Sequence, residues 1–227
     1  TPTLTLVPIS TAFNSPIGID FHEPTASVVM SVNYSSGIPH NFERVLLDGS
    51  HVQFSTFSGL TNEVKIATAR PGNRAGFASG TFFVGNGVDG QVVRISPDGA
   101  TIDNPWVDLP GDGNGLMRGS LYVDQTGLYG DELVVATTTG QVWRIDVNGA
   151  PTQIADLGVH LEGVITVPDA PARYGPLAGR ILSGAENEGF LHAIAGDGTW
   201  DSYDFGAQVE GLDRRMPFAH LSAGHFG

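Results

Sequence analysis

The stretch GQVVRISPDG, residues 90–99, is followed fifty positions later by GQVWRIDVNG, residues 140–149. Each stretch places alternating apolar residues before an Asp-Gly or Asn-Gly pair, and two other apolar runs of the chain end in the same way. The intervals between the glycines of these pairs are 50, 50 and 49 residues. A constant interval of this kind indicates a structural repeat. The four glycines are Gly49, Gly99, Gly149 and Gly198.

A second series of glycines supports the repeat, because each of them precedes an apolar segment. The intervals in this series are 50, 49 and 45 residues. Two independent series do not keep nearly the same interval by chance, so we infer that the chain repeats one structural unit about every fifty residues. The second series consists of Gly80, Gly130, Gly179 and Gly224.

The sequence pattern of each repeat predicts that the unit folds into four short β-strands joined by tight turns. The Asn148-Gly149 pair is a typical two-residue hairpin signal, since type I′ turns need positive φ at both central positions. Four antiparallel strands repeated at this length describe a blade of a β-propeller. The predicted fold is therefore an all-β propeller forming one domain over residues 1–227. In the third repeat the strands are expected at residues 115–124, 131–137, 141–146 and 151–157.

The sequence favours a ring of five blades, with six as the alternative. The segment 5–18 aligns with 150–163, so the N-terminus is expected to supply an outermost strand that completes the last blade and removes a free sheet edge. By the repeat, we expect that the third strand and most of the second strand of that last blade are missing, so that the sequence is a fragment, the last blade is degenerate or more blades follow. The expected blades are residues 15–60, 61–112, 113–158, 159–208, and 209–227 together with 1–14.

Composition excludes several classes of partner and chemistry. The chain has 24 acidic and 11 basic residues and a formal net charge of −13, so it lacks the basic surface that nucleic acids require. No apolar run is long enough for a membrane helix, and we expect no membrane insertion. The absence of cysteine excludes disulfides and thiolate chemistry. An acidic, glycine-rich chain without cysteine is typical of exported bacterial proteins, which favours an extracellular or periplasmic location.

The start of the innermost strand of each blade carries the clearest functional pattern. Innermost strands line the central channel, so residues at their starts are expected at its mouth. Three carboxylates crowded there would repel one another unless a cation neutralised them. Oxygen ligands of this kind suit Ca²⁺, with Mg²⁺ as another possible ion. The predicted slot holds Ile17, Glu63, Asn114, Glu162 and Glu210, and the last four are the predicted metal ligands.

A simpler interpretation of the same glutamates remains open. Each can be a rim residue that accepts backbone hydrogen bonds or pairs with Arg118, Arg214 or Arg215.

Loops and one histidine extend the candidate site. The loop between the second and third strand of each blade opens on the same face as the channel mouth. The candidate ligand-binding residues in these loops are Asn86, Glu186, Asn187 and Glu188. His160 precedes Glu162 by two positions, so His160 or Glu162 is the candidate general base if the site is catalytic. A turn histidine bonded to backbone is the alternative role for His160.

The segment GNGVDGQVVRISPDG at 85–99 resembles the blades of NHL-type, virginiamycin B lyase-like and gluconolactonase/regucalcin-like propellers. The resemblance covers most of the chain as a blade pattern and concerns architecture. Gluconolactonase-like enzymes bind one divalent metal at the channel mouth through Glu and Asn side chains. Their similarity implies Glu63, Asn114, Glu162 and Glu210 as ligands. Those enzymes add an aspartate that acts as base, and Ile17 occupies that slot here.

Three functions are compatible with these observations. The first is an exported module that binds a divalent cation and recognises a neutral or carbohydrate-like ligand or a protein partner. The second is a metal-dependent hydrolase or lyase that acts on a lactone, ester or phosphoester at the same mouth. The third is a structural propeller that serves as a spacer. The sequence favours the first, because a complete set of catalytic residues cannot be assembled from it.

Overall fold

The computed structural model describes residues 8, 10–46, 48–118, 120–209 and 212. These residues form four antiparallel four-stranded sheets, and within each sheet consecutive strands are neighbours. The first sheet contains β1 (Ile19–His22), β2 (Ser27–Ser31), β3 (Phe42–Val45) and β4 (His51–Gln53), and the second contains β5 (Ala67–Thr68), β6 (Phe82–Gly85), β7 (Gln91–Ile95) and β8 (Ile102–Asp108). The third contains β9 (Leu121–Val123), β10 (Leu133–Ala136), β11 (Gln141–Ile145) and β12 (Pro151–Asp156), and the fourth β13 (Glu162–Thr166), β14 (Ile181–Ala185), β15 (Phe190–Ile194) and β16 (Trp200–Asp204).

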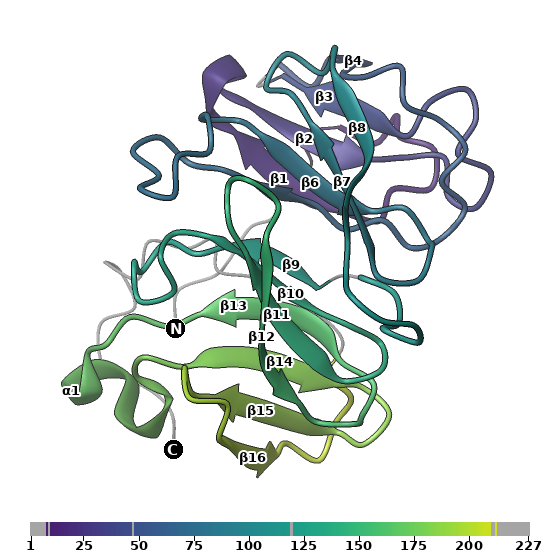
Figure 1. Ribbon diagram of the computed structural model, residues 1–227. Helices are drawn as coiled ribbons and strands as arrows, with labels where there is room; N and C mark the ends of the chain where they lie inside the picture. Colours follow the sequence, from purple (N-terminus) through teal and green to yellow (C-terminus); the bar gives the residue numbers. More distant parts are fainter. Residues whose placement is uncertain (1–7, 9, 47, 119, 210–211, 213–227) are drawn as a thin grey trace, which may run out of the picture.

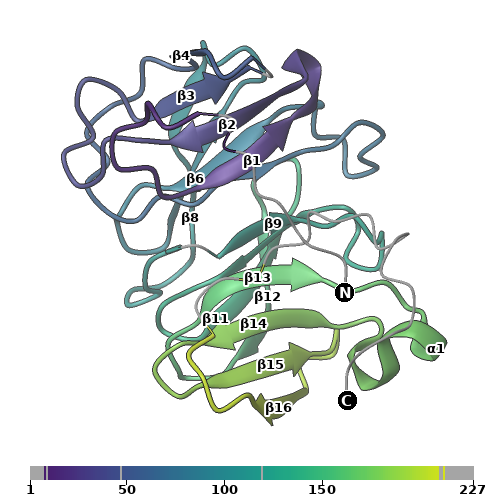
Figure 2. The ribbon, with the colours of Figure 1, turned by 180° about the vertical axis from the view of Figure 1, so that it is seen from behind.

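The four sheets are blades of a propeller, as the repeat predicted. The first strands of successive sheets contact one another in the order β1, β5, β9 and β13, so each blade places its first strand innermost. In Figure 1 the first two blades, coloured purple to teal, lie above the third and fourth, coloured green to yellow. Figure 2 shows the same succession from behind.

Burial within each strand follows from this stacking. All four residues of β6 and of β10 are buried, because both faces of these middle strands are covered by neighbouring blades. The outer strand β4, by contrast, is exposed along its length. Apolar side chains fill the spaces between blades: Val29 and Phe42 of the first blade, for example, belong to one cluster with Phe82 of the second. The core is thus a series of layers between blades.

The turn glycines of the repeat have a second role besides the turn. Gly99 and Gly198 both have positive φ, at 76° and 86°, but the residues before them, Asp98 and Asp197, do not, so these turns are not the two-residue type I′ turns expected from the sequence. A Cβ added to Gly198 would lie 2.5 Å from the carbonyl oxygen of Ile154 in the preceding blade, and one added to Gly99 would overlap the carbonyl oxygen of Phe54. The glycine is therefore required both by the hairpin and by the close contact between blades.

The number of blades corrects the sequence-based prediction. The described residues form four blades, and neither five nor six. The fifth was expected from 209–227 together with 1–14, and most of these residues lie outside the described part. Residue 8 and residues 10–14 of the predicted closing strand are described and contain no strand, so closure by the N-terminus is unconfirmed.

Helices are few and short among the described residues. The 3-10 helix η1 (Glu23–Thr25) joins β1 to β2, and α1 (Pro171–Tyr174) with η2 (Gly175–Leu177) joins β13 to β14. Within the described ranges, no helix has the length and apolar character needed to cross a bilayer.

Candidate functional site

Glu162 is placed at the inner edge of the propeller by the local structure of β13. It is the first residue of that strand and pairs with Gly184 of β14. The register shifts between Glu162 and Val164, so Gly163, with φ 72°, is an extra residue in the strand. Such a bulge reorients the side chains on either side of it. The Glu162 side chain is 2% exposed, and a carboxylate buried to this degree needs a charged or donating partner.

Three side chains that can bind a metal, Glu162 among them, come together here. Nε2 of His160 lies 2.9 Å from Oε1 of Glu162. Ligand atoms of His160, Glu162 and Glu186 all lie within 4.8 Å of one another. Glu186 directly follows β14, whose residue Gly184 pairs with Glu162, so the pairing of β13 and β14 brings these two carboxylates together.

Arg118 connects this cluster to Glu63. Its Nη2 lies 3.1 Å from Oε2 of Glu63, and its Nη1 lies 3.9 Å from Oε1 of Glu162. The Arg118 Nε is buried and has no hydrogen-bond partner among the described residues. Two of the predicted metal ligands, Glu63 and Glu162, are thus brought to the same place, and both pair with the arginine that the simpler interpretation had named.

Asn114 has other partners. Its side-chain NH₂ donates to the carbonyl oxygens of Leu109 at 3.2 Å and Gly111 at 2.8 Å, and its backbone N–H donates to Asp89 at 3.2 Å. Asn114 lies seven residues before the innermost strand β9, whereas Glu162 begins β13, so the two residues are not in one slot. Glu210 lies outside the described residues.

The predicted loop residues divide into two groups. Asn86 donates to Gln91 at 2.9 Å and to Asn104 at 2.8 Å, so its amide holds the local loop structure of the second blade. Asn187 and Glu188 are exposed beside Glu186 in the turn between β14 and β15. Of the two glutamates in this loop, Glu186 joins the cluster of possible metal ligands found among the described residues, and Glu188 does not.

The hydrogen bond between His160 and Glu162 fixes what the imidazole can do. When Glu162 is ionised it only accepts hydrogen bonds, so His160 then donates from Nε2, and a neutral imidazole in that tautomer has its lone pair on Nδ1. A buried carboxylate that orients a histidine in this way prepares it as a general base. Binding of a cation at Nε2 would replace the shared proton. The arrangement is therefore compatible with both a metal site and a base.

The membership of the cluster differs from the sequence-based prediction, which separated metal ligands from loop residues and took His160 as a candidate base or a turn histidine bonded to backbone. The acidic loop GAENEG at 184–189 was the available signal for Glu186, since it was expected on the same face as Glu162. Arg118 had been named as one of three arginines that could pair with these glutamates, and the structure shows its pairing with Glu63 and Glu162.

Comparisons with known proteins establish the fold. No protein-family model and no curated protein matches the chain. Among solved structures, a streptogramin B lyase matches with a TM-score of 0.59 and 10% identity over 86% of this chain and 56% of its own. A catalytically inactive virginiamycin B lyase variant from Staphylococcus aureus with quinupristin matches with a TM-score of 0.61 and 11% identity over 86% and 58%.

A binding protein belongs to the same group of similar structures. An auxiliary nutrient binding protein from Bacteroides ovatus matches with a TM-score of 0.62 and 12% identity, over 85% of this chain and 48% of its own. The chain thus spans about half the length of these structures. The resemblance to propellers of the lyase and gluconolactonase type is confirmed at the level of the fold, and identities this low carry no activity from one protein to another.

Proposed function

We propose that this β-propeller is a binding module that holds a divalent cation at its inner edge through His160, Glu162 and Glu186. The observation that carries the proposal is the mutual approach of their ligand atoms to within 4.8 Å. Ligands about 2.1 Å from a metal lie at most about 4.2 Å apart, so small side-chain movements would complete the coordination. The buried Glu162 would gain a full counter-charge in the process.

The ligand types favour one group of ions over another. Carboxylate oxygens suit Mg²⁺, Ca²⁺ and Mn²⁺, whereas an imidazole suits Zn²⁺ and other transition metals. A set of one imidazole and two carboxylates therefore favours Mn²⁺ or Zn²⁺ over the Ca²⁺ or Mg²⁺ expected from sequence. Because the protein supplies only three metal-coordinating side chains, the cation keeps open coordination positions for an oxygen of the bound molecule.

We expect the molecule that this module binds to lie beside the cation, in contact with the loop between β14 and β15. Asn187 and Glu188 are exposed next to Glu186 and can hydrogen-bond to hydroxyl groups, which fits a neutral or carbohydrate-like ligand or a protein partner. The similar nutrient binding protein supports a binding role, and an extracellular or periplasmic location is proposed with it.

A second function is favoured by the hydrogen bond between His160 and Glu162. A histidine oriented by a buried carboxylate can act as a general base, and a cation nearby can polarise a carbonyl or phosphoryl oxygen. The module would then be a hydrolase or lyase acting on a lactone, ester or phosphoester. The similarity in fold to lyases and to a putative gluconolactonase agrees with this alternative.

Metal binding is tested by calorimetry and thermal unfolding with Mn²⁺, Zn²⁺, Ca²⁺ and Mg²⁺. A cation at one hundred times its Kd stabilises the folded state by about 2.7 kcal/mol, which for this chain length raises Tm by about 5–10 °C. Glu162→Gln and Glu186→Gln are expected to abolish the increase, and Glu188→Gln, in the same loop, to retain it. An unchanged Tm of the native protein with all four ions would contradict the proposal.

The catalytic alternative has its own measurement. Hydrolysis of a panel of lactones, aryl esters and phosphoesters is expected to vanish with chelator and to return with added cation. Turnover of any substrate in the panel separates the two functions, because a binding module has none. His160→Gln is expected to weaken cation binding in both cases and, if the protein is an enzyme, to abolish turnover. Turnover that is indifferent to chelator would exclude the metal mechanism.

A further inference from the structure

The junction between the third and fourth blades contains a groove. Two adjoining pockets, of about 290 and 360 Å³, lie between these blades and share Leu128, Tyr129 and Gly196 in their walls. Both blades are described without interruption from residue 120 to residue 209. The groove is therefore formed within the described part of the chain, by residues of two blades that are both complete.

The groove is separate from the candidate metal site. Glu162 begins β13, whereas Asp169, which lines the second pocket, follows the end of that strand. Gly179 of the same pocket precedes β14, whereas Glu186 follows it. The two sites thus lie at opposite ends of the paired strands β13 and β14.

A glycine opens the groove at the turn of the fourth blade. Val147 and Gly196 both stand two residues before the turn glycine of their blade. Val147, like Ala75, packs against the apolar cluster between the second and third blades, whereas Gly196 has no side chain to place between the third and fourth. The φ angle of Gly196 lies outside the range from +20° to +160°, and a Cβ there would lie 3.8 Å from Cε1 of Tyr129, an ordinary contact. Neither the backbone nor the packing therefore requires glycine at this position.

A smaller residue also stands where the second blade has a tryptophan. Trp106 precedes the residue that pairs with Val92, and Ile154 precedes the residue that pairs with Val142, so the two residues occupy matched places. The ring of Trp106 helps to fill the junction between the second and third blades, and the Arg94 guanidinium stacks over it at 4.9 Å. Ile154 instead lines the first pocket. The groove thus has room for a flat ring at the place that the indole fills one junction earlier.

Arg144, which lines the first pocket, lacks the acidic partner of its counterpart in the second blade. Arg94 lies opposite Asp103, and its Nε donates to that carboxylate at 2.9 Å. Arg144 lies opposite Thr152, which carries no charge. Among the described residues the Arg144 side chain makes no hydrogen bond, and its ion pair joins Nε to Oε2 of Glu132 at 3.6 Å. A guanidinium with unused donors in the wall of a pocket can bind an anion.

We propose that this groove binds a small molecule that carries a flat apolar ring and a carboxylate. The carboxylate accepts hydrogen bonds from Arg144, as Asp103 does from Arg94 in the second blade. The ring lies against Ile154 and Gly196, in the space that larger side chains fill at the preceding junction. The ligand thus supplies, from outside, the two kinds of group that the chain itself supplies there. A pocket of about 290 Å³ suits a ligand of this small size.

The acidic side chains near Arg144 leave it available to the ligand. Oδ1 of Asp197, in the wall of the same pocket, accepts from N and Oγ1 of Thr199 at 3.0 and 2.7 Å. That carboxylate is therefore used within its own turn. Glu132 is the competitor for the guanidinium, and its distance of 3.6 Å from Nε is longer than a hydrogen bond. Loss of the Glu132 charge is accordingly expected to strengthen anion binding.

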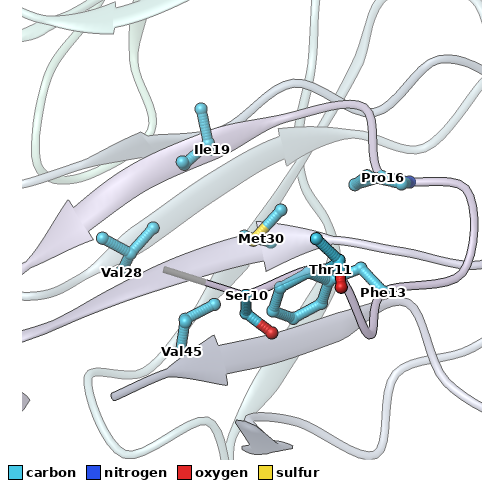
Figure 3. Close-up of a pocket in the computed structure, with 8 residues that line it drawn as sticks. All are labelled: Ser10, Thr11, Phe13, Pro16, Ile19, Val28, Met30 and Val45. Atoms are coloured by element: carbon cyan, nitrogen blue, oxygen red, sulfur yellow. The ribbon is translucent and has the colours of Figure 1, made fainter. Parts of the chain in front are cut away.

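A second pocket in the molecule differs in chemistry. It has a volume of about 440 Å³ and lies on the first blade, where Phe13 lies over the sheet near Met30 (Figure 3). The described residues that line it are apolar apart from Ser10 and Thr11, and none of them is charged. An apolar ring could enter this pocket, but nothing in its described wall would select a carboxylate.

Calorimetry of the full chain with 3-indolepropionate tests the proposal. Chelator is present, so that a cation at the candidate metal site does not contribute. One molecule is expected to bind per chain. The neutral 3-indolepropionamide and the ringless propionate are each expected to bind at least about tenfold more weakly, because each lacks one of the two recognised groups.

Four substitutions locate the site. Arg144→Gln is expected to weaken binding of 3-indolepropionate at least about tenfold, and Gly196→Val, which restores a side chain like that of Val147, to weaken it similarly by filling the groove. Glu132→Gln is expected to bind the acid more tightly, since the competing carboxylate is gone. Arg94→Gln is the matched control and should keep the native affinity, because its guanidinium is already paired within the second blade. Circular dichroism checks that every variant is folded.

A peptide that ends in tryptophan presents the same ring and carboxylate. Tighter binding of Gly-Gly-Trp than of 3-indolepropionate would support the proposal with a peptide C-terminus as the source of the ligand, and weaker binding would support it with a free aromatic acid. The proposal is overturned if the native protein binds neither molecule at millimolar concentration. It is also overturned if Arg144→Gln and Arg94→Gln weaken binding equally, or if Gly196→Val leaves the affinity unchanged.

Discussion

Nη1 of Arg118 lies 3.9 Å from Oε1 of Glu162, the same oxygen that accepts a hydrogen bond from His160. The guanidinium thus occupies part of the space around the buried carboxylate that a cation would neutralise. Because Nη2 also pairs with Glu63, one arginine joins a carboxylate just before the inner strand of the second blade to the carboxylate that begins the inner strand of the fourth. Arg118 thus neutralises part of the charge of Glu162 and Glu63, and a bound cation would interact with the same Glu162 carboxylate.

Replacing Arg118 separates its structural effect from its effect on metal affinity. Arg118→Gln is expected to lower the free energy of unfolding by about 1–3 kcal/mol without metal, since Glu162 loses a partner in a buried position. The same variant should bind Mn²⁺ or Zn²⁺ more tightly than the native protein, because one positive charge no longer competes. Urea unfolding and calorimetry measure the two effects. Weaker metal binding by Arg118→Gln would show that Arg118 supports the metal site rather than competing with it.

The inter-blade glycines permit a matched comparison. Gly99→Ala adds a Cβ that meets the Phe54 carbonyl oxygen of the first blade, whereas Gly72, with a similar φ of 73°, has open space around the corresponding position. Both substitutions cost about 1–2 kcal/mol for the left-handed backbone. We expect Gly99→Ala to cost at least about 1 kcal/mol more in urea unfolding, as overpacking does. Equal losses would show that the blades adjust to the added methyl group.

The same glycines explain why the fold was predictable. The turn and the contact between blades both require glycine, so the repeat survives in sequence at Gly99, Gly149 and Gly198. Strands are bounded by these turns, and the third and fourth strands of the third repeat were found within one residue of their expected limits. The first was expected at 115–124 and begins only at Leu121.

The candidate site was predictable only where strand pairing determines it. Glu162 and Glu186 come together because β13 pairs with β14, a relation that the hairpin pattern predicts. Asn114 was misplaced because the segment before β9 folds around Asp89, whose carboxylate accepts from three backbone N–H groups, those of Gly113, Asn114 and Gly115. No periodic pattern encodes that turn. The direction of the Arg118 side chain depends on the same irregular segment.

Asp124 of the third blade accepts a hydrogen bond from Thr166 of the fourth. We expect this contact between the two blades to weaken in acid. Burial opposes the ionisation of this carboxyl group, but hydrogen bonds from Thr126, Thr166 and Tyr129 outweigh this effect and hold the pKa of Asp124 below its ordinary 3.8. A depressed carboxyl pKa stabilises the fold above the unfolded-state value, and this contribution is lost as pH falls through the folded-state value. We therefore expect the free energy of unfolding to decline below about pH 4.

Asp124→Asn tests this junction. The amide accepts with only one oxygen, so several donors lose their partner, and the variant is expected to be about 1–3 kcal/mol less stable at neutral pH. The difference from the native protein should shrink in acid, where the native carboxyl is protonated. Urea unfolding between neutral and acidic pH measures both effects. Asp112→Asn, at an exposed position, serves as control, and a difference that stays constant with pH would refute the assignment.

The environment of Tyr129 predicts that the folded state also loses stability at alkaline pH. The Tyr129 hydroxyl donates to the Gly179 carbonyl oxygen at 2.7 Å, and the residue is 3% exposed. Burial and, next, the charge of Asp124 raise the pKa of Tyr129 to about 12. A raised pKa means that the stabilisation is present below the unfolded-state pKa near 10 and is lost as pH rises toward 12.

Ultraviolet titration of the phenol groups distinguishes Tyr129 from the other four tyrosines. In the native protein one tyrosine is expected to ionise only at about pH 12 or on unfolding. Tyr129→Phe should remove this late step and lower the free energy of unfolding by about 1 kcal/mol, the net value of one hydrogen bond. Tyr34→Phe, at a 41% exposed position, should leave the late step in place. If all five tyrosines of the folded protein ionised together near pH 10, Tyr129 would not be shielded at the junction between the third and fourth blades.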